Sequence, residues 1–550
     1  MIPNLNKQKK LIILILFYSF SLLVALLTFK DYGVHIEEKF HRLNGHYWLN
    51  YIAKVFDLNS IQQITEVKLS EISDYTLSSV ARYNKYSVIL DVPSALLEIS
   101  MSLNDPKEIY YLKHILSFSI FLFSSYFFFK ILEYRYNNFY LSFAGLIFYL
   151  TTPRIIGDSF LYKDVLFLSF FTITFYFLHK SLINLNFKNL VFFSLFTALS
   201  INLRVFAILI PFLFLFIILI KSFFLKDFTN TLKKILFYFF CFIFFLILFW
   251  PYLWSNPLNN FLDIFVSIKQ DLINIKIFYD GEYVSNQFLP ETYLTNWLFI
   301  SSPIAHTILF FLGFFFYSSR ILNRFFKIKA NTIYNDLWRG RGEEIDFIFY
   351  FFLISFYFFF MVLNAPLYNG WRLVYFLNIF IIYFVINYLS LLIKSYRSIN
   401  FYKIVFTLMV LMIGYNFFAL VKTHPYQSIY FNTFLSEKTK NSYEGDYYGL
   451  ATKHFFEKII TEDNRKIINV AVASHTPIQR GLESLPKNVR KKINVVGQEY
   501  ELANYIFKNN ISEVNAKLIK KYKIPENFSK IYELKIDRVV IYEIYKLNSD

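Results

Sequence analysis

The chain has 550 residues, of which 56% are hydrophobic and 17% charged, and its formal net charge is +17. Soluble domains carry about a quarter charged residues, so this composition excludes an ordinary soluble protein and predicts a polytopic α-helical membrane protein. In such a protein a basic excess indicates positively charged cytoplasmic loops, and no nucleic-acid partner is expected. The single cysteine, Cys241, excludes a disulfide framework within the chain.

Apolar runs long enough to cross a bilayer predict about eleven transmembrane helices. The first run follows the basic sequence KQKK and has no small-residue cleavage site, so we interpret it as a retained signal anchor. The third and fifth runs are short for a span, which is typical of tilted or re-entrant segments. In chain order the runs lie near 11–29, 111–130, 139–152, 164–184, 189–201, 204–221, 234–250, 296–318, 345–363, 372–393 and 402–421.

Lysine and arginine gather in alternate loops, most densely at 320–344. Because positively charged loops stay in the cytoplasm, the N-terminus is predicted to be cytoplasmic and the number of spans odd. Three longer segments then lie outside: the first loop at 30–110, a second at 251–295, and the tail from residue 424. The expected location is the inner (plasma) membrane, with these segments on the periplasmic face.

The tail differs in composition from the rest of the chain. We predict two domains, a transmembrane domain at 1–423 and a small extracytoplasmic α/β domain at 424–550. Short apolar runs at 467–474, 492–498 and 537–547 predict strands, and HFFEKIITE (454–462) and ELANYIFKN (501–509) predict helices between them. The tail contains no phosphate-binding glycine motif, so a structural or partner-contacting role is preferred for it.

Ionisable residues collect at the predicted outside ends of separate spans. Such groups are costly at membrane depth and tend to face one another or a cavity, so their convergence predicts a site for an anionic ligand beside a carboxylate. Taken singly, each has a simpler interpretation: a solvated loop end, a helix N-terminus favoured by acids, or an arginine anchored at lipid headgroups. The candidates are Asp31, Glu37, Glu38, Asp158, Lys163, Asp164, Arg204 and Arg372.

Five motifs, in this order along the chain, resemble the GT-C class of polyprenyl-phosphate-sugar-dependent glycosyltransferases. Within this class, the similarity is to the bacterial relatives of protein mannosyltransferases and aminoarabinose transferases. The motifs are the acidic pair in GVHIEEKF (33–40), TPRIIGDSFLYKD (152–164), YNGWRLVYF (368–376), HPYQSIYFN (424–432) and DYYG (446–449). Two positions depart from the family pattern: Glu37 replaces the usual Asp of the acidic pair, and Leu373 replaces the usual His after Trp-Arg.

The resemblance implies an inverting transfer of a sugar, hexosyl or pentosyl, from a polyprenyl-phosphate donor to an acceptor hydroxyl on the outer face of the membrane. It makes Glu37 the expected general base, with Glu38 as its orienting partner or substitute. Arg372 and Lys163 are the expected contacts of the donor phosphate, and Arg204 is a weaker third. Asp158 and Asp164 are expected to bind acceptor hydroxyls or a divalent metal.

Several alternatives stay open at this point. Oxygen ligands would suit a divalent cation, but the sequence contains no dense cluster of them, so a metal cofactor is not established. The acceptor could be a glycan, a lipid or a protein. The competing functions are a multi-span transporter, a lipid-linked-glycan flippase or polymerase, and a membrane scaffold; against a transporter, the sequence shows no internal repeat.

Overall fold

The computed structural model describes residues 6–71, 85, 87–225, 228–270, 276–326, 340–362, 367–395, 399–511 and 520–548. Parts of the predicted loops 30–110, 251–295 and 320–344 lie outside these residues. The helical bundle consists of α1 (Lys7–Thr28), α6 (Pro106–Tyr136), α7 (Phe139–Thr151), α8 (Pro153–Ser159), α9 (Asp164–Ile183), α10 (Phe187–Leu203), η1 (Val205–Ile208), α11 (Leu209–Leu225), α12 (Phe228–Leu248), α14 (Tyr293–Ser301), α15 (Ile304–Phe325), α17 (Gly340–Val362), η3 (Arg372–Leu377), α18 (Asn378–Ser395) and α19 (Ile399–Thr423).

Nine helices among the described residues are long and apolar enough to cross a membrane, and a tenth span results if the bent pair of α7 and α8 is counted as one. The pair bends by 63° at its break, and α10 is apolar but has only 17 residues. These are the third and fifth of the predicted runs: α7 with α8 has the bend of a broken or re-entrant span, whereas a tilt of α10 stays a prediction. All eleven predicted runs coincide with helices, although two of them fall short of a regular span.

Side-chain caps begin several of these helices. Asn6, Asp105, Asn138 and Asn186 precede α1, α6, α7 and α10, and each side chain accepts a hydrogen bond from a backbone N–H of the first turn. Such caps satisfy amides that have no partner inside the helix. The polar residue before each apolar run therefore determines where the helix begins.

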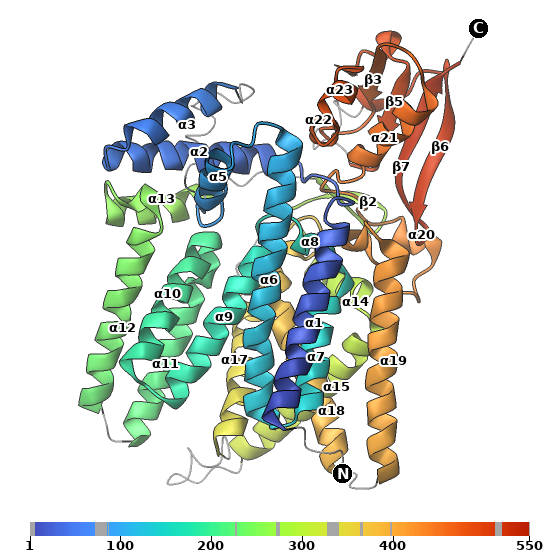
Figure 1. Cartoon of the computed structure of the whole chain (residues 1–550). Helices are drawn as coiled ribbons and strands as arrows, with labels where there is room; N and C mark the ends of the chain where they lie inside the picture. The colour runs from blue at the N-terminus through green and yellow to red at the C-terminus, as the bar shows by residue number, and fades with distance from the viewer. Residues whose placement is uncertain are drawn as a thin grey trace.

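The two ends of the helical bundle differ (Figure 1). One end carries the start of α1, the end of α15 and the start of α17. The other end carries the C-terminal sheet and the described elements of the first and second long loops. These loop elements are α2 (Glu38–Val55), α3 (Asn59–Glu71), α5 (Asp91–Ser100), η2 (Pro251–Leu253), α13 (Pro257–Gln270), β1 (Lys276–Tyr279) and β2 (Glu282–Ser285). The described parts of the three segments predicted to share one side of the membrane thus lie at one end of the bundle.

At the end of the N-terminus, the first turns of α17 join three other helices. Its acidic sequence GEEID (342–346) supplies carboxylates to cations on α15, α11 and α6. The Arg135–Asp346 pair is bidentate, at 2.7 and 2.6 Å, and Asp346 is fully buried. The pairs are Arg320 with Glu343, Lys221 with Glu344, and Arg135 with Asp346.

The tail forms a five-stranded sheet in the order β4-β3-β5-β7-β6. β3 pairs parallel with β4 and β5, and β7 pairs antiparallel with β5 and β6. Its elements are η4 (Gln427–Ile429), α20 (Glu437–Lys440), α21 (Thr452–Glu462), β3 (Ile468–Val472), α22 (Gln479–Glu483), α23 (Lys487–Arg490), β4 (Ile493–Gly497), η5 (Tyr500–Leu502), β5 (Tyr505–Lys508), η6 (Lys520–Tyr522), β6 (Phe528–Ile536) and β7 (Val539–Leu547).

The predicted helix over 501–509 is wrong. This segment is η5 followed by β5, the central strand of the sheet. Tyr505, Ile506 and Phe507 are all buried, because a central strand is covered on both faces and loses the alternation that marks a half-exposed strand. The predicted strands at 467–474, 492–498 and 537–547 and the helix at 454–462 are confirmed. The domain boundary at residue 424 stays a prediction.

Candidate functional site

Four chain segments bring charged residues together at the end of the bundle opposite the N-terminus. Glu37 lies directly before α2, Asp164 is the first residue of α9, Arg204 lies between α10 and η1, and Arg372 is the first residue of η3. These four residues are called the arginine cluster below. Because each residue lies at the end of a helix, the four charged groups can contact one another although they are distant in sequence. None of them lies in the apolar middle of a helix.

Arg372 is the centre of the arginine cluster. Its Nη2 lies 3.5 Å from Oε1 of Glu37, and its Nη1 lies 3.7 Å from Oδ2 of Asp164. Arg204 pairs with the other oxygen of Asp164. Both distances at Arg372 exceed an ordinary charge-assisted hydrogen bond, so the guanidinium is attracted to two carboxylates without being closely bound by either.

Both arginines keep buried donors without an acceptor. Within the part of the chain that the structure describes, Nε of Arg372 and Nε of Arg204 are buried and have no hydrogen-bond partner. A buried unsatisfied donor costs about 1–3 kcal/mol. The two guanidinium groups can therefore still donate hydrogen bonds to an anionic ligand.

Lys163 adds a third cation beside the arginine cluster. Burial, together with the nearby charge of Arg204, lowers the pKa of Lys163 to about 8, against the opposing attraction of Glu37 and Asp164. Its backbone has φ +96° and ψ −63°, a rare conformation for a residue with a side chain. Such strain concentrates at functional sites. With three cations facing two carboxylates, this region has an excess of positive charge.

Glu37 is ionised in this surrounding. Burial alone would raise its pKa, but Arg372, followed by His35 and Lys163, holds the pKa of Glu37 well below its usual range. The side chain is still 38% exposed, so the carboxylate is reachable from solvent.

His35 is a neutral neighbour of the arginine cluster. Burial lowers the pKa of His35 to about 4, and its Nδ1 accepts a hydrogen bond of 2.9 Å from the backbone N–H of Glu37. The neutral ring therefore carries its proton on Nε2. Because this nitrogen is protonated, it does not accept a hydrogen bond from Arg372 Nη1, which lies 3.4 Å away. This geometry gives His35 a structural role.

Asp158 lies in a separate, more enclosed position next to the arginine cluster. Its Oδ2 accepts hydrogen bonds from Tyr375 Oη at 2.7 Å and from Tyr448 Oη at 3.0 Å. Its Oδ1 is buried without a partner among the described residues. Three of the motifs named above, TPRIIGDSFLYKD, YNGWRLVYF and DYYG, thus meet at one carboxylate.

The DYYG motif is fitted closely against the first loop. Gly449 has φ +72°, a conformation that favours glycine, and the backbone N–H of Ile36 donates to the carbonyl of Tyr448 at 3.1 Å. A Cβ added to Gly33 would lie 2.0 Å from the carbonyl oxygen of Leu450. The small residues allow the two backbones to touch, which positions Tyr448 over the His35 ring with centroids 4.3 Å apart.

Glu38 is directed away from Glu37 and toward α6. Its Oε2 accepts a hydrogen bond of 2.8 Å from Lys113 Nζ, and both side chains are almost fully buried, at 1% and 2% exposure. Beside them, His41 contacts Asp91 at 3.2 Å. Glu38 therefore belongs to a buried ion pair between the first loop and α6.

Asp31 is not brought to the arginine cluster. Its carboxylate pairs with His424 Nε2 at 2.9 Å, and 49% of the side chain is exposed. This contact joins the end of α1 to the HPYQSIYFN motif, so Asp31 connects two chain segments at the surface of this end.

The sequence does not reveal the contacts of four residues in this region, Tyr375, Tyr448, Lys113 and Arg154. Tyr375 and Tyr448 lie inside two of the motifs, but in a chain with 43 tyrosines the residue type alone does not single out their hydroxyl groups. Lys113 lies within a predicted span, where a single lysine indicates that it pairs with a buried acidic residue. Arg154, in TPRIIGDSFLYKD, is buried between Trp297 and Phe431, with its guanidinium carbon 4.9 Å from each ring centroid.

No group of three or more histidine, cysteine, aspartate or glutamate side chains in the described ranges has the arrangement of a metal site. Comparison of the chain with models of protein families and with curated proteins finds no match. The arginine cluster itself is therefore the basis for any functional assignment.

Proposed function

We propose that the protein is a membrane glycosyltransferase that moves a sugar from a polyprenyl-phosphate donor to an acceptor hydroxyl. The observation that carries this proposal is the arrangement of Arg372 and Arg204, which keep unused buried donors, beside the solvent-accessible carboxylate of Glu37. The resemblance of five ordered motifs to the GT-C class supports the same reaction. The acceptor, whether glycan, lipid or protein, is left open.

The donor phosphate would bind at Arg372. A guanidinium donates two parallel hydrogen bonds to a phosphate, which an ammonium group cannot do. Leu373, in place of the family's histidine, is half-buried and packs with the apolar core, so Arg372, Arg204 and Lys163 would share the phosphate without that residue. The lipid chain of such a donor stays in the bilayer, next to a site at the ends of membrane helices.

Glu37 would become a base when the donor binds. In the unliganded protein Arg372 lowers the pKa of Glu37, which makes the carboxylate a weak proton acceptor. A phosphate that engages Arg372 neutralises part of this charge, and the pKa of Glu37 then rises toward the range where a base is effective. The site would thus acquire its base only with the donor in place, which limits wasteful hydrolysis.

The chemical step is a single displacement. The acceptor oxygen attacks the anomeric carbon and forms the new glycosidic bond while the bond from this carbon to the phosphate oxygen breaks. The hydroxyl proton passes to Glu37, and the polyprenyl phosphate leaves with its charge stabilised by the arginines. Attack opposite the leaving group inverts the anomeric configuration.

A transporter would use charged groups in another place. Transport sites lie near the middle of the membrane, commonly at broken helices in matching halves. The arginine cluster is built from residues at the starts and ends of its helices, on the side of the long loops. This placement favours chemistry at the membrane surface over passage through it.

The test is a comparison of envelope glycans by mass spectrometry in cells that lack the gene and cells complemented with variants. We expect the deletion to remove one sugar substituent, wild type to restore it, and Glu37→Gln to fail at equal protein level. Loss of a general base typically costs about 10²–10⁴-fold in rate. Arg372→Lys should restore less of the sugar substituent than wild type, because lysine keeps the charge but cannot donate two parallel hydrogen bonds to the phosphate.

The matched control is Glu66→Gln. Glu66 lies on α3 at the same end of the protein, is half exposed, and contacts Lys54 and Gln62 at the surface, so its variant should behave as wild type. Envelope glycans identical with and without the gene would refute the transferase. Full complementation by Glu37→Gln would refute the role of Glu37 alone.

A further inference from the structure

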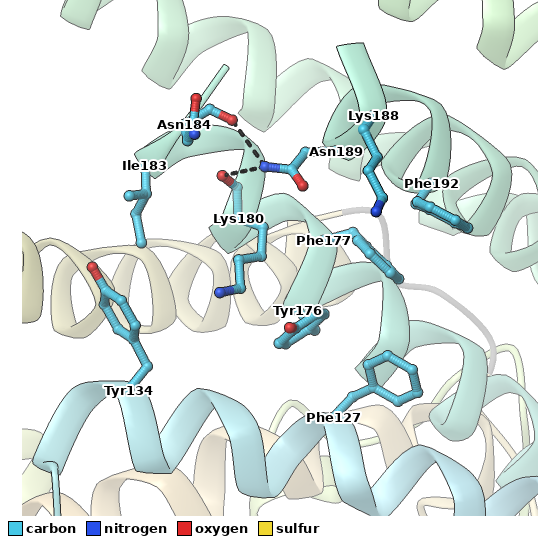
Figure 2. Close-up of a pocket in the computed structure, with 10 residues that line it drawn as sticks. All are labelled: Phe127, Tyr134, Tyr176, Phe177, Lys180, Ile183, Asn184, Lys188, Asn189 and Phe192. Carbon is cyan, nitrogen blue, oxygen red and sulfur yellow. Dashed lines mark hydrogen bonds between the residues drawn. The ribbon is translucent and has the colours of Figure 1, made fainter. Parts of the chain in front are cut away.

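A cavity of about 780 Å³ opens between α6, α9 and α10. It lies at the end of the bundle that carries the N-terminus, opposite the arginine cluster (Figure 1). Figure 2 shows its lining side chains coming from these three helices and from the loop between α9 and α10. The proposed transferase chemistry makes no use of this cavity.

The cavity is cationic where the helices end. Lys180 lies in the last turn of α9, and Lys188 in the first turn of α10. Lys180 Nζ is 5.5 Å from the ring centroid of Tyr176 and 5.7 Å from that of Tyr134. Neither lysine forms an ion pair with any carboxylate of the described ranges, and the cavity lining contains no acidic residue.

The loop between the two lysines is held in place. The side-chain amide of Asn189 donates to the carbonyl of Lys180 at 3.2 Å and to the carbonyl of Asn184 at 3.0 Å (Figure 2). These bonds tie the end of α9 to the start of α10, so the cationic mouth is part of the folded structure.

The cavity becomes aromatic with depth. Phe127 lies nine residues before the end of α6, and Phe177 six residues before the end of α9, which places them about 14 and 9 Å inside the helix ends. Half of a bilayer's hydrocarbon core is about 15 Å thick. Charged groups therefore line the level of lipid headgroups, and rings line the level of acyl chains.

We propose that this cavity binds an anionic phospholipid, with the phosphate between Lys180 and Lys188 and an acyl chain along the aromatic wall. Two unpaired lysines match a negative headgroup, and Phe127, Phe177 and Phe192 match a hydrocarbon chain. A soluble anion would use the mouth alone and leave the aromatic wall uncovered. The site is independent of the transferase reaction at the opposite end.

The experiment measures lipid binding to the delipidated full chain in detergent, by native mass spectrometry, with phosphatidylglycerol and phosphatidylcholine as probes. We expect preferential binding of phosphatidylglycerol to wild type. The double variant Lys180→Gln/Lys188→Gln should lose about 5-fold in affinity for each lysine. Lys180→Arg/Lys188→Arg should bind as wild type, which separates loss of charge from loss of fold.

The control is Lys233→Gln/Lys234→Gln, which removes two charges near the start of α12 at the same end but outside the cavity. It should retain the preference for phosphatidylglycerol. Equal binding of the two lipids by wild type would overturn the proposal, and so would unchanged binding in Lys180→Gln/Lys188→Gln. Competition by millimolar inorganic phosphate as effective as that by phosphatidylglycerol would assign the mouth to a soluble anion and overturn the lipid assignment.

Discussion

Lys163 combines two features that are unfavourable for a lysine. Its backbone adopts a conformation with positive φ, and its ammonium group is buried beside Arg204, which lowers its pKa to about 8. Each feature costs free energy that an ordinary loop lysine would not incur. An anion bound between Lys163 and the arginine cluster would remove the electrostatic part of this cost.

The depressed pKa of Lys163 predicts a pH effect on donor use. Because the lysine loses its charge as the pH rises through about 8, kcat/KM for a polyprenyl-phosphate sugar should fall across this range. This parameter reports the ionisation of the free enzyme. Lys163→Arg keeps its charge at these pH values, so the fall should disappear in that variant.

The kinetic measurement is a pH series with purified wild type, Lys163→Arg and the surface control Lys54→Arg. Lys54 is 53% exposed, and its variant should show the wild-type profile. The same decline in Lys163→Arg as in wild type would assign the titration to another group.

For single residues, the sequence predicted which side chains lie near the site better than it predicted which groups they pair with. Glu37, Asp164 and Arg372 could be expected to be neighbours, because each lies next to an apolar run on the same predicted side of the membrane. Ionisable groups in that position avoid lipid by contacting one another. Which oxygen faces which nitrogen depends on how the helices pack. For this reason Glu38 and Asp31, adjacent to the site in sequence, turned out to pair with Lys113 and His424.

Among the elements, α2 and α6 are joined by the buried pair of Glu38 and Lys113. Burial alone would raise the pKa of Glu38, but Lys113 outweighs it and holds this pKa below the usual range. Lys113→Met would leave a buried carboxylate without its partner, which typically costs about 3–5 kcal/mol. We expect a clearly lower Tm for this variant in a thermal unfolding series.

The sign of the pH effect identifies the cause. Without Lys113 the pKa of Glu38 should exceed its unfolded value, so the folded state gains stability as the pH falls and loses it as the pH rises. The deficit in Tm relative to wild type should therefore shrink between pH of about 7 and about 5. Lys54→Met, which breaks an exposed pair of 3.5 Å, should change Tm little. A deficit that does not depend on pH would point to lost packing at Lys113.

Elements were predictable where one face of the chain meets lipid or solvent. Long apolar runs led directly to α1, α6 and α19, because length alone decides whether a run can cross a membrane. β5 was missed because a strand that is buried on both sides carries no alternation. The break between α7 and α8 lies before Pro153, and proline disfavours a helical conformation in the residue that precedes it, but the 63° bend there depends on packing against η4.

As a whole, the molecule separates its charges by function between its two ends. At one end the carboxylates of α17 are saturated by cations from three helices, which fixes the bundle. At the other end Arg372 and Arg204 retain unsatisfied donors. The acidic residues of α17 are thus paired within the bundle, whereas the arginine cluster keeps donors for a ligand.

This polarity makes the orientation in the membrane testable. Cations at the end of the N-terminus, among them Lys7, Lys9 and Lys10 in α1 and Arg320 and Arg324 near the end of α15, predict that this end is cytoplasmic. Fusions truncated after residue 330 and after residue 460 attach a reporter shortly after α15 and within α21, respectively. We expect a reporter that is active only in the cytoplasm to work at 330, and one that is active only after export to work at 460, with each failing at the other position. Cytoplasmic activity at both positions would exclude the predicted topology, because the chain between them would then cross the membrane an even number of times, and the arginine cluster would have to be reconsidered as a cytoplasmic site.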